Sequence, residues 1–151
     1  MDHALRLGAD RSLLQAMADS LDGRRGIRTF RRVLENADSR SESPGETLTR
    51  ELILRLGIRP PTPQFEVTSP IGRHRLDFAW KKEKVALEFD GKVKYFDFQP
   101  TNEVLFQERL REKALTEEGW LFVRVEWKDL FNEAQFKNRV LRALAGRPRA
   151  V

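Results

Sequence analysis

The segment from residue 64 to residue 91 constrains the fold of this 151-residue chain more than any other feature. It contains three short stretches in which apolar and polar residues alternate, QFEVTS, HRLDFAW and VALEFDG, separated by the polar turns PIG and KKEK. Alternation with a period of two is typical of β-strands, and such short connections join antiparallel neighbours. The sequence therefore predicts a three-stranded meander, in which Leu76, Phe78 and Trp80 share one apolar face.

Helices are predicted on both sides of this meander. The stretch SPGE at residues 43–46 is a capping box with proline at the first helical position, and the helix that follows ends at Gly57. After the meander come an amphipathic helix that ends at Gly119, a short apolar strand WLFVRVEW, and a final helix that ends at Gly146. The order of helices and strands places the chain in the α/β class.

The N-terminal part is predicted to be a helical lead-in. Two stretches, SLLQAMADSL and GIRTFRRVLENA, carry apolar residues at helical spacing and are separated by LDGRRG. The polar stretch NADSRSESPGE follows and is the best candidate for a boundary. We predict a lead-in over residues 1–41 and a domain over residues 42–147. One interpretation is that the lead-in helices dock on a partner or form a homodimer with a second copy.

Composition narrows the class of protein. The chain has no cysteine, so disulfides and thiolate metal sites do not contribute. No apolar run approaches the roughly 20 residues of a membrane span, and the N-terminus does not resemble a signal peptide. These features predict a soluble protein of the cytoplasm with no membrane partner. The net charge of +5, with a basic C-terminal end, favours a polyanionic partner such as nucleic acid.

Three acids on the predicted strands are the strongest candidates for chemistry. Asp77 lies on the second strand, and Glu88 and Asp90 lie on the third. The four-residue turn brings Asp77 close to cross-strand register with Glu88, so that their carboxylates come within reach of one ion. Such oxygen ligands suit Mg²⁺ or Mn²⁺ rather than zinc. The alternative is that the acids lie on the solvent face of the meander, although the apolar stretch VALEF indicates a central strand.

Taken together, these motifs resemble the PD-(D/E)xK nuclease superfamily. Ten residues separate Asp77 from the motif Glu88-x-Asp90. A helix that carries Glu46 precedes these acids in the sequence, and a helix and a further strand follow them. The closer resemblance is to the Vsr-like branch, which resembles very-short-patch-repair endonucleases, and it covers roughly residues 42–145. The matching pieces are SPGETLTRELILRLG, QFEV, RLDFAW, VALEFDGKVKY, ERLREKALTEEGWLFVRV and the closing helix. The lead-in also resembles the segment that precedes this domain in longer actinobacterial proteins.

The resemblance implies a restriction-endonuclease-like core, in which a helix, three strands, a helix, a strand and a helix build a mixed sheet. It makes Asp77 and Glu88 metal-ligand acids. Asp90 takes the place of the lysine of the wider superfamily and is a further candidate metal ligand and catalytic residue. A histidine common in the Vsr-like branch is replaced here by Lys94. Lys92 or Lys94 is therefore expected to supply positive charge at the site.

Further residues are expected near the site, some from their position in the predicted strands and some from the resemblance. Glu46 is either a catalytic residue or the capping partner of its own helix, and the two roles are compatible. Gln64 begins the first strand and is expected to border the site. Glu108 and Arg111 are spaced i, i+3, so an intrahelical ion pair is the default, while the resemblance turns them toward the site. Arg124 points to the acidic face, where it pairs with carboxylates or with a phosphate.

The resemblance implies a Mg²⁺- or Mn²⁺-dependent endonuclease that hydrolyses phosphodiester bonds in DNA, with RNA left open. Lys92, Lys94, Arg111, Arg124 and Gln64 are the expected nucleic-acid contacts. The rival interpretation is a nuclease fold that has lost catalysis and serves as a nucleic-acid-binding or assembly module. The presence of all three acids argues against that rival.

Overall fold

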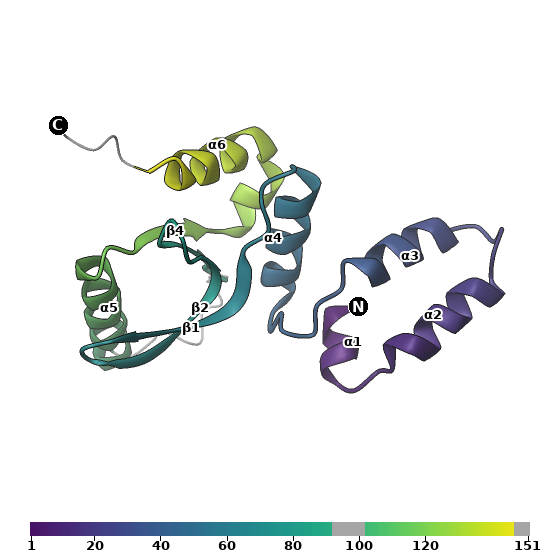
Figure 1. Ribbon diagram of the computed structural model, residues 1–151, viewed down its shortest axis with the longest axis horizontal. Coiled ribbons are helices and arrows are strands. Elements are labelled where there is room, and N and C mark those ends of the chain that lie inside the picture. Colours follow the sequence, from purple (N-terminus) through teal and green to yellow (C-terminus); the bar gives the residue numbers. More distant parts are fainter. Residues whose placement is uncertain (92–101, 147–151) are drawn as a thin grey trace. The chain divides into compact units, whose positions relative to one another are not determined.

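The computed structural model describes residues 1–91 and 102–146 (Figure 1). The chain divides into two compact units, Met1–Thr47 and Leu48–Val151. The described residues form six α-helices and one four-stranded mixed sheet, so the α/β class is confirmed. None of the helices in these residues has the length and apolar character needed to cross a membrane.

The first unit contains the helices α1 (Asp2–Arg6), α2 (Arg11–Ser20) and α3 (Ile27–Glu35). The two longer helices coincide with the two helical stretches predicted in the lead-in, and they form a hairpin in Figure 1. The carboxylate of Asp10 caps α2 by accepting a hydrogen bond from the N–H of Ser12 at 2.7 Å. The guanidinium of Arg11 donates to the carbonyl of Leu34 at 2.8 Å, which ties the start of α2 to the end of α3.

Helix α4 (Pro44–Arg55) begins in the first unit and continues into the second. The second unit then follows the predicted order of three strands, a helix, a strand and a helix, with a short 3-10 helix added before the last helix. Its remaining elements are β1 (Thr62–Ser69), β2 (Gly72–Trp80), β3 (Val85–Phe89), α5 (Asn102–Glu117), β4 (Leu121–Val125), η1 (Trp127–Phe131) and α6 (Glu133–Leu144).

The sheet has the strand order β1-β2-β3-β4. The first three strands pair antiparallel, as a meander does, and β4 pairs parallel to β3. A parallel neighbour needs a crossover connection, and α5 lies in that connection. The carboxyl ends of β3 and β4 therefore lie side by side at the same edge of the sheet.

Helices cover both faces of this sheet. On one face, Phe78 and Leu87 pack with Ile53 of α4 and Phe136 of α6 in the larger apolar cluster. On the other face, a smaller cluster joins residues of the sheet to Leu115 of α5. The polar residues of the second face lie beyond this smaller cluster, and they provide the candidate site.

The alternation of β2 breaks at Asp77. Phe78 belongs to the larger cluster, whereas Leu76 packs in the smaller one, so the predicted shared face is wrong for Leu76. The ladder between β1 and β2 skips the facing residues Gln64 and Asp77, and Gln64 has a positive φ of 50°. The side chains of β2 change faces at this interruption of the ladder.

Candidate functional site

Asp77 lies where β2 separates from β3, and its carboxylate joins the two strands at that point. Its Oδ2 accepts a hydrogen bond from the backbone N–H of Phe89 at 2.9 Å. The ladder between the strands reaches the pair Phe78↔Leu87, and one further step in antiparallel register brings Asp77 opposite Glu88. This arrangement agrees with the cross-strand register predicted from the length of the turn.

Glu88 is a largely buried carboxylate with a positive neighbour. Its side chain is 16% exposed, and one of its oxygens contacts the guanidinium of Arg111. The same guanidinium nitrogen donates to the carbonyl of Arg75 at 3.1 Å. Burial raises the pKa of Glu88 more than the charge of Arg111 lowers it, and the nearby charge of Asp77 raises it further. The neutral form of Glu88 is therefore favoured more than it would be in water.

Arg124 lies on β4, next to Glu88 of β3, and two acids of α5 contact its guanidinium group. The strand register pairs Glu88 with Arg124. Its guanidinium donates to Glu108 Oε1 at 3.1 Å and to Glu112 Oε2 at 2.7 Å. Burial acts to lower the pKa of Arg124, but the hydrogen bonds to Glu112 and Glu108 outweigh burial and the pKa is raised. The predicted intrahelical pair between Glu108 and Arg111 is wrong, because each residue contacts a different strand of the sheet.

The structure places Asp90 one residue beyond the end of β3. Its backbone N–H donates to the carbonyl of Val125 at 2.7 Å, which extends the pairing of β3 with β4. Together with Glu126, Trp127 and Lys128, Asp90 lines a hollow of about 130 Å³. Among these neighbours, the positive charge of Lys128 is paired with Glu126 at 2.7 Å. Asp90 thus borders the carboxyl end of the sheet.

Glu46 belongs to the first unit and is buried there. Its carboxylate accepts a hydrogen bond from the N–H of Glu42 at 2.9 Å, and its own N–H donates to Ser43 Oγ at 3.1 Å. These two bonds satisfy backbone groups at the start of α4, as a capping residue does. The capping role of Glu46 is therefore observed, and its catalytic role stays a prediction.

The other predicted contacts divide into two groups. Gln64 lies on β1 at the position that faces Asp77, where its backbone is left-handed. Lys92 and Lys94 lie outside the described residues, so the predictions made for them stay predictions.

Whether this arrangement suits a metal ion depends on its oxygen donors. Within residues 1–91 and 102–146, no three acidic or histidine side chains form a cluster suited to a metal ion. Asp77 and Glu88 carry carboxylates on adjacent strands, and the charge of Asp77 raises the pKa of Glu88. Mg²⁺ is commonly held by one or two carboxylates, with water and substrate oxygens as its other ligands. This pair of carboxylates fits such an ion.

Sequence reasoning did not assign two polar residues near this group. Glu112 contacts Arg124 from the turn of α5 after Glu108, and the i, i+4 spacing of the two acids on one helix was the available signal. His74 lies on β2, and its Nε2 lies 2.8 Å from Ser69 Oγ. Burial lowers the pKa of His74, and the positive charge of Arg111 lowers it further.

Comparison with known proteins identifies relatives but no function. Two uncharacterized proteins of Mycobacterium tuberculosis, from strains CDC 1551 and H37Rv, are each 29% identical to this chain over 135 residues. The match covers 88% of this chain and 48% of each relative, so the chain spans about half the length of the curated relatives it matches. No family model matches the chain, and no solved structure gives a significant match.

Proposed function

We propose that this protein is a metal-dependent nuclease that hydrolyses phosphodiester bonds in DNA, with RNA as an alternative substrate. One observation carries the proposal: Glu88, whose side chain is 16% exposed beside Arg111, has a pKa that burial and the charge of Asp77 on the adjacent strand raise. A buried carboxylate with an acidic neighbour is costly unless a cation compensates it. Perturbed acids of this kind are common at functional sites.

The architecture supports the same proposal. Helix α4, the meander β1–β3, helix α5, strand β4 and helix α6 follow in the order expected of a restriction-endonuclease-like core. The parallel pairing of β3 with β4 is the mixed pairing that this core requires. Fold alone does not determine function, so the carboxylate pair remains the main support.

The residues of the site would have separate tasks. Asp77 and Glu88 would hold Mg²⁺ or Mn²⁺, and such an ion supplies an activated water and offsets the charge of the scissile phosphate. Arg111 and Arg124 carry positive charge beside Glu88, and they would bind and orient phosphate oxygens of the substrate. Glu108 and Glu112 of α5 both accept hydrogen bonds from the guanidinium of Arg124, which limits the directions in which that group can point.

Asp90, Lys92 and Lys94 are proposed to complete this site, as the family resemblance implies. Asp90 would serve as a third acidic ligand, and the two lysines would supply charge near the reacting phosphate. Gln64 would border the groove.

The test combines metal binding with cleavage of supercoiled plasmid. Calorimetric titration of Mg²⁺ and Mn²⁺ is performed on the wild type, Asp77→Asn and Glu88→Gln, with Glu133→Gln as the matched control. Glu133 is an acid that pairs with Arg55 at 2.6 Å, outside the candidate site. We expect the wild type and the control to bind the metal and nick the plasmid, and both site variants to lose both properties. A wild type that neither binds metal nor nicks, or an Asp77→Asn variant that nicks normally, would contradict the proposal.

The second candidate is a nuclease fold without catalysis that binds nucleic acid or assists assembly. It is favoured by the contact between Arg111 and Glu88, since an internal cation already occupies part of the space around the carboxylate. This function predicts nucleic-acid binding that is unchanged by EDTA and by Glu88→Gln, with no nicking under any metal.

A further inference from the structure

The corner between α2 and α3 in the first unit contains a hollow of about 530 Å³, lined by residues 22–29. Three arginines, Arg24, Arg25 and Arg28, form part of this lining. The volume lies in the range of about 300–1,000 Å³ that is typical of ligand sites. All three arginines are exposed, so their guanidinium groups are available to a partner.

The positive charge of this hollow is not compensated within the described residues. The acid in its lining, Asp22, is already paired with Arg31 at 2.8 Å, and Arg31 also lies 3.4 Å from Asp19. No ion pair or hydrogen bond within residues 1–91 and 102–146 engages the guanidinium groups of the three lining arginines. Arg31 therefore serves the internal structure of the hairpin, and the other three are left to face solvent.

Two glycines bring these arginines together. Gly23 and Gly26 have φ values of 76° and 87°, a conformation that residues with a side chain rarely adopt. An added Cβ at either glycine would meet no atom within 4 Å, so the requirement is for the backbone conformation and not for space. The tight corner places three arginines within five residues of chain along one hollow.

We propose that this hollow, called here the arginine corner (Arg24, Arg25 and Arg28), binds phosphates of a nucleic-acid backbone. Guanidinium groups donate two parallel hydrogen bonds to a phosphate and keep their charge at all relevant pH values. The choice of nucleic acid among polyanions rests on the proposed nuclease function of the second unit. The corner adds to that function a backbone contact outside the unit that carries Asp77 and Glu88.

An acidic protein segment is the competing partner. A neighbouring hollow of about 290 Å³ is lined by apolar residues, among them Met17, Leu21 and Phe30, together with Arg24 and Arg25. An acidic amphipathic helix would need both hollows, whereas a phosphate backbone needs only the arginine corner. The larger and more polar hollow holds all three arginines, which favours the phosphate backbone.

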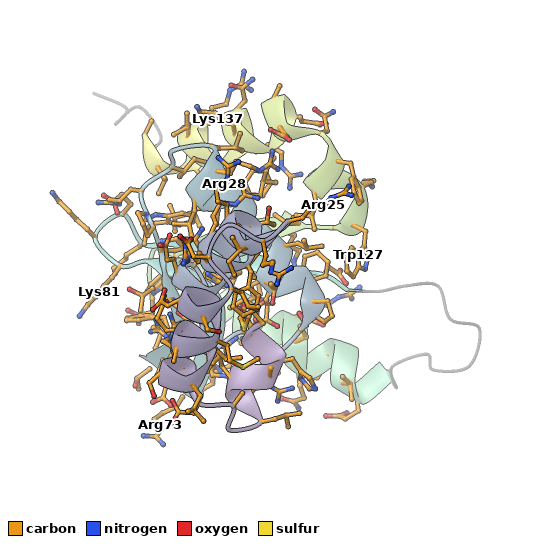
Figure 2. The ribbon with its side chains drawn as sticks, turned by 90° about the vertical axis from the view of Figure 1, so that its right-hand side faces the viewer. Arg25, Arg28, Arg73, Lys81, Trp127 and Lys137 are labelled. Carbon is orange, nitrogen blue, oxygen red and sulfur yellow. The ribbon has the colours of Figure 1, made fainter. Side chains whose placement is uncertain are left out.

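The experiment measures binding of the full chain to a fluorescent duplex of about 30 base pairs in EDTA, where hydrolysis is suppressed. The test variant combines Arg24→Gln, Arg25→Gln and Arg28→Gln. The control combines Arg73→Gln, Lys81→Gln and Lys137→Gln, which removes the same charge from scattered positions of the second unit. Figure 2 marks these three control residues, as well as Arg25 and Arg28 of the corner. Thermal unfolding confirms that both variants are folded.

We expect the corner variant to bind at least tenfold more weakly at about 100 mM salt, and the control to bind within threefold of the wild type. The slope of log K against log salt should become shallower by about 2.7 in the corner variant, because each lost phosphate contact removes about 0.9. Equal weakening of both variants would show an effect of net charge and overturn the proposal. Absence of duplex binding by the wild type would also overturn it.

Polyglutamate provides the test of the competing partner. If it displaces the duplex from the wild type at equal charge concentration, and binds the corner variant much more weakly, the corner is a site for acidic protein and the proposal fails. The proposed nuclease and the proposed arginine corner can fail separately. Normal duplex binding by the corner variant, with metal-dependent nicking intact, would refute only the corner. Loss of binding without any nicking would support the corner and refute the nuclease.

Discussion

Substitution of Arg111 by glutamine tests whether Glu88 is a buried charge that depends on a cation. The Arg111 side chain is 29% exposed, and that of Glu88 is 16% exposed. Removing the guanidinium leaves the Glu88 carboxylate without its ion-pair partner and also removes the hydrogen bond to the carbonyl of Arg75. Because the carboxylate stays buried, the substitution should destabilise the fold at neutral pH.

The magnitude follows from the burial of the pair. Breaking a fully buried ion pair costs about 3–5 kcal/mol. A hydrogen bond to a charged group contributes about 1.5–3 kcal/mol. Since Arg111 retains some exposure and water can partly replace it, we expect Arg111→Gln to lower the free energy of unfolding by about 2 kcal/mol.

The assay is urea unfolding at pH 7 in metal-free buffer, arranged as a double-mutant cycle with Glu88→Gln. In the Glu88→Gln background, Arg111→Gln should cost only about 0.5–1 kcal/mol, which is the hydrogen bond to Arg75. The coupling between the two positions is then about 1–1.5 kcal/mol. An equal cost of Arg111→Gln in both backgrounds would refute the reasoning, because it would show that the arginine stabilises the fold without engaging Glu88.

Three further predictions follow from the same group of residues. Asp77→Ala should lower the free energy of unfolding in urea by about 1–3 kcal/mol, because the N–H of Phe89 loses its acceptor, whereas Asp77→Asn keeps an oxygen there and should cost less than about 1 kcal/mol; equal costs would contradict this. The folded-state pKa of His74 is lowered from its ordinary value of 6.5, so its contribution to stability is present above pH 6.5 and is lost as the pH falls. The melting temperature should therefore fall between pH 7.5 and 5.5, and fall less in His74→Gln; identical pH profiles would argue against this role. If Asp77 and Glu88 hold a divalent ion, Mn²⁺ should raise the melting temperature of Arg111→Gln more than that of the wild type, because the arginine no longer competes for Glu88; an equal or smaller rise would count against a shared position.

Local signals in the sequence predicted the longer helices and the four strands, but not α1 or the short 3-10 helix η1. The period of two in the meander and the capping box before α4 depend on neighbouring residues, and the structure shows both. The length of the KKEK turn was sufficient for the register of Asp77 and Glu88, because a short turn between antiparallel strands leaves few alternatives.

The partners of the charged residues depended on packing between distant segments. The spacing along α5 would allow Glu108 to pair with Arg111. In the structure, Glu108 pairs instead with Arg124 of the sheet, and Arg111 pairs with Glu88 of the sheet. A contact within a helix is weak and exposed, whereas a contact between a helix and the sheet combines charge with burial. No pattern within α5 distinguishes these outcomes.

The face of Leu76 is a second feature that came from long-range structure. Alternation along β2 assigns Leu76 and Phe78 to one side, yet the left-handed backbone of Gln64 on the facing strand interrupts the ladder at Asp77. Periodicity describes one strand at a time, whereas an interruption of the ladder is a property of two strands. Sequence patterns therefore predicted which residues form strands and which acids are neighbours. The pairing of strands and helices determined the face on which each side chain lies and the cation beside each carboxylate.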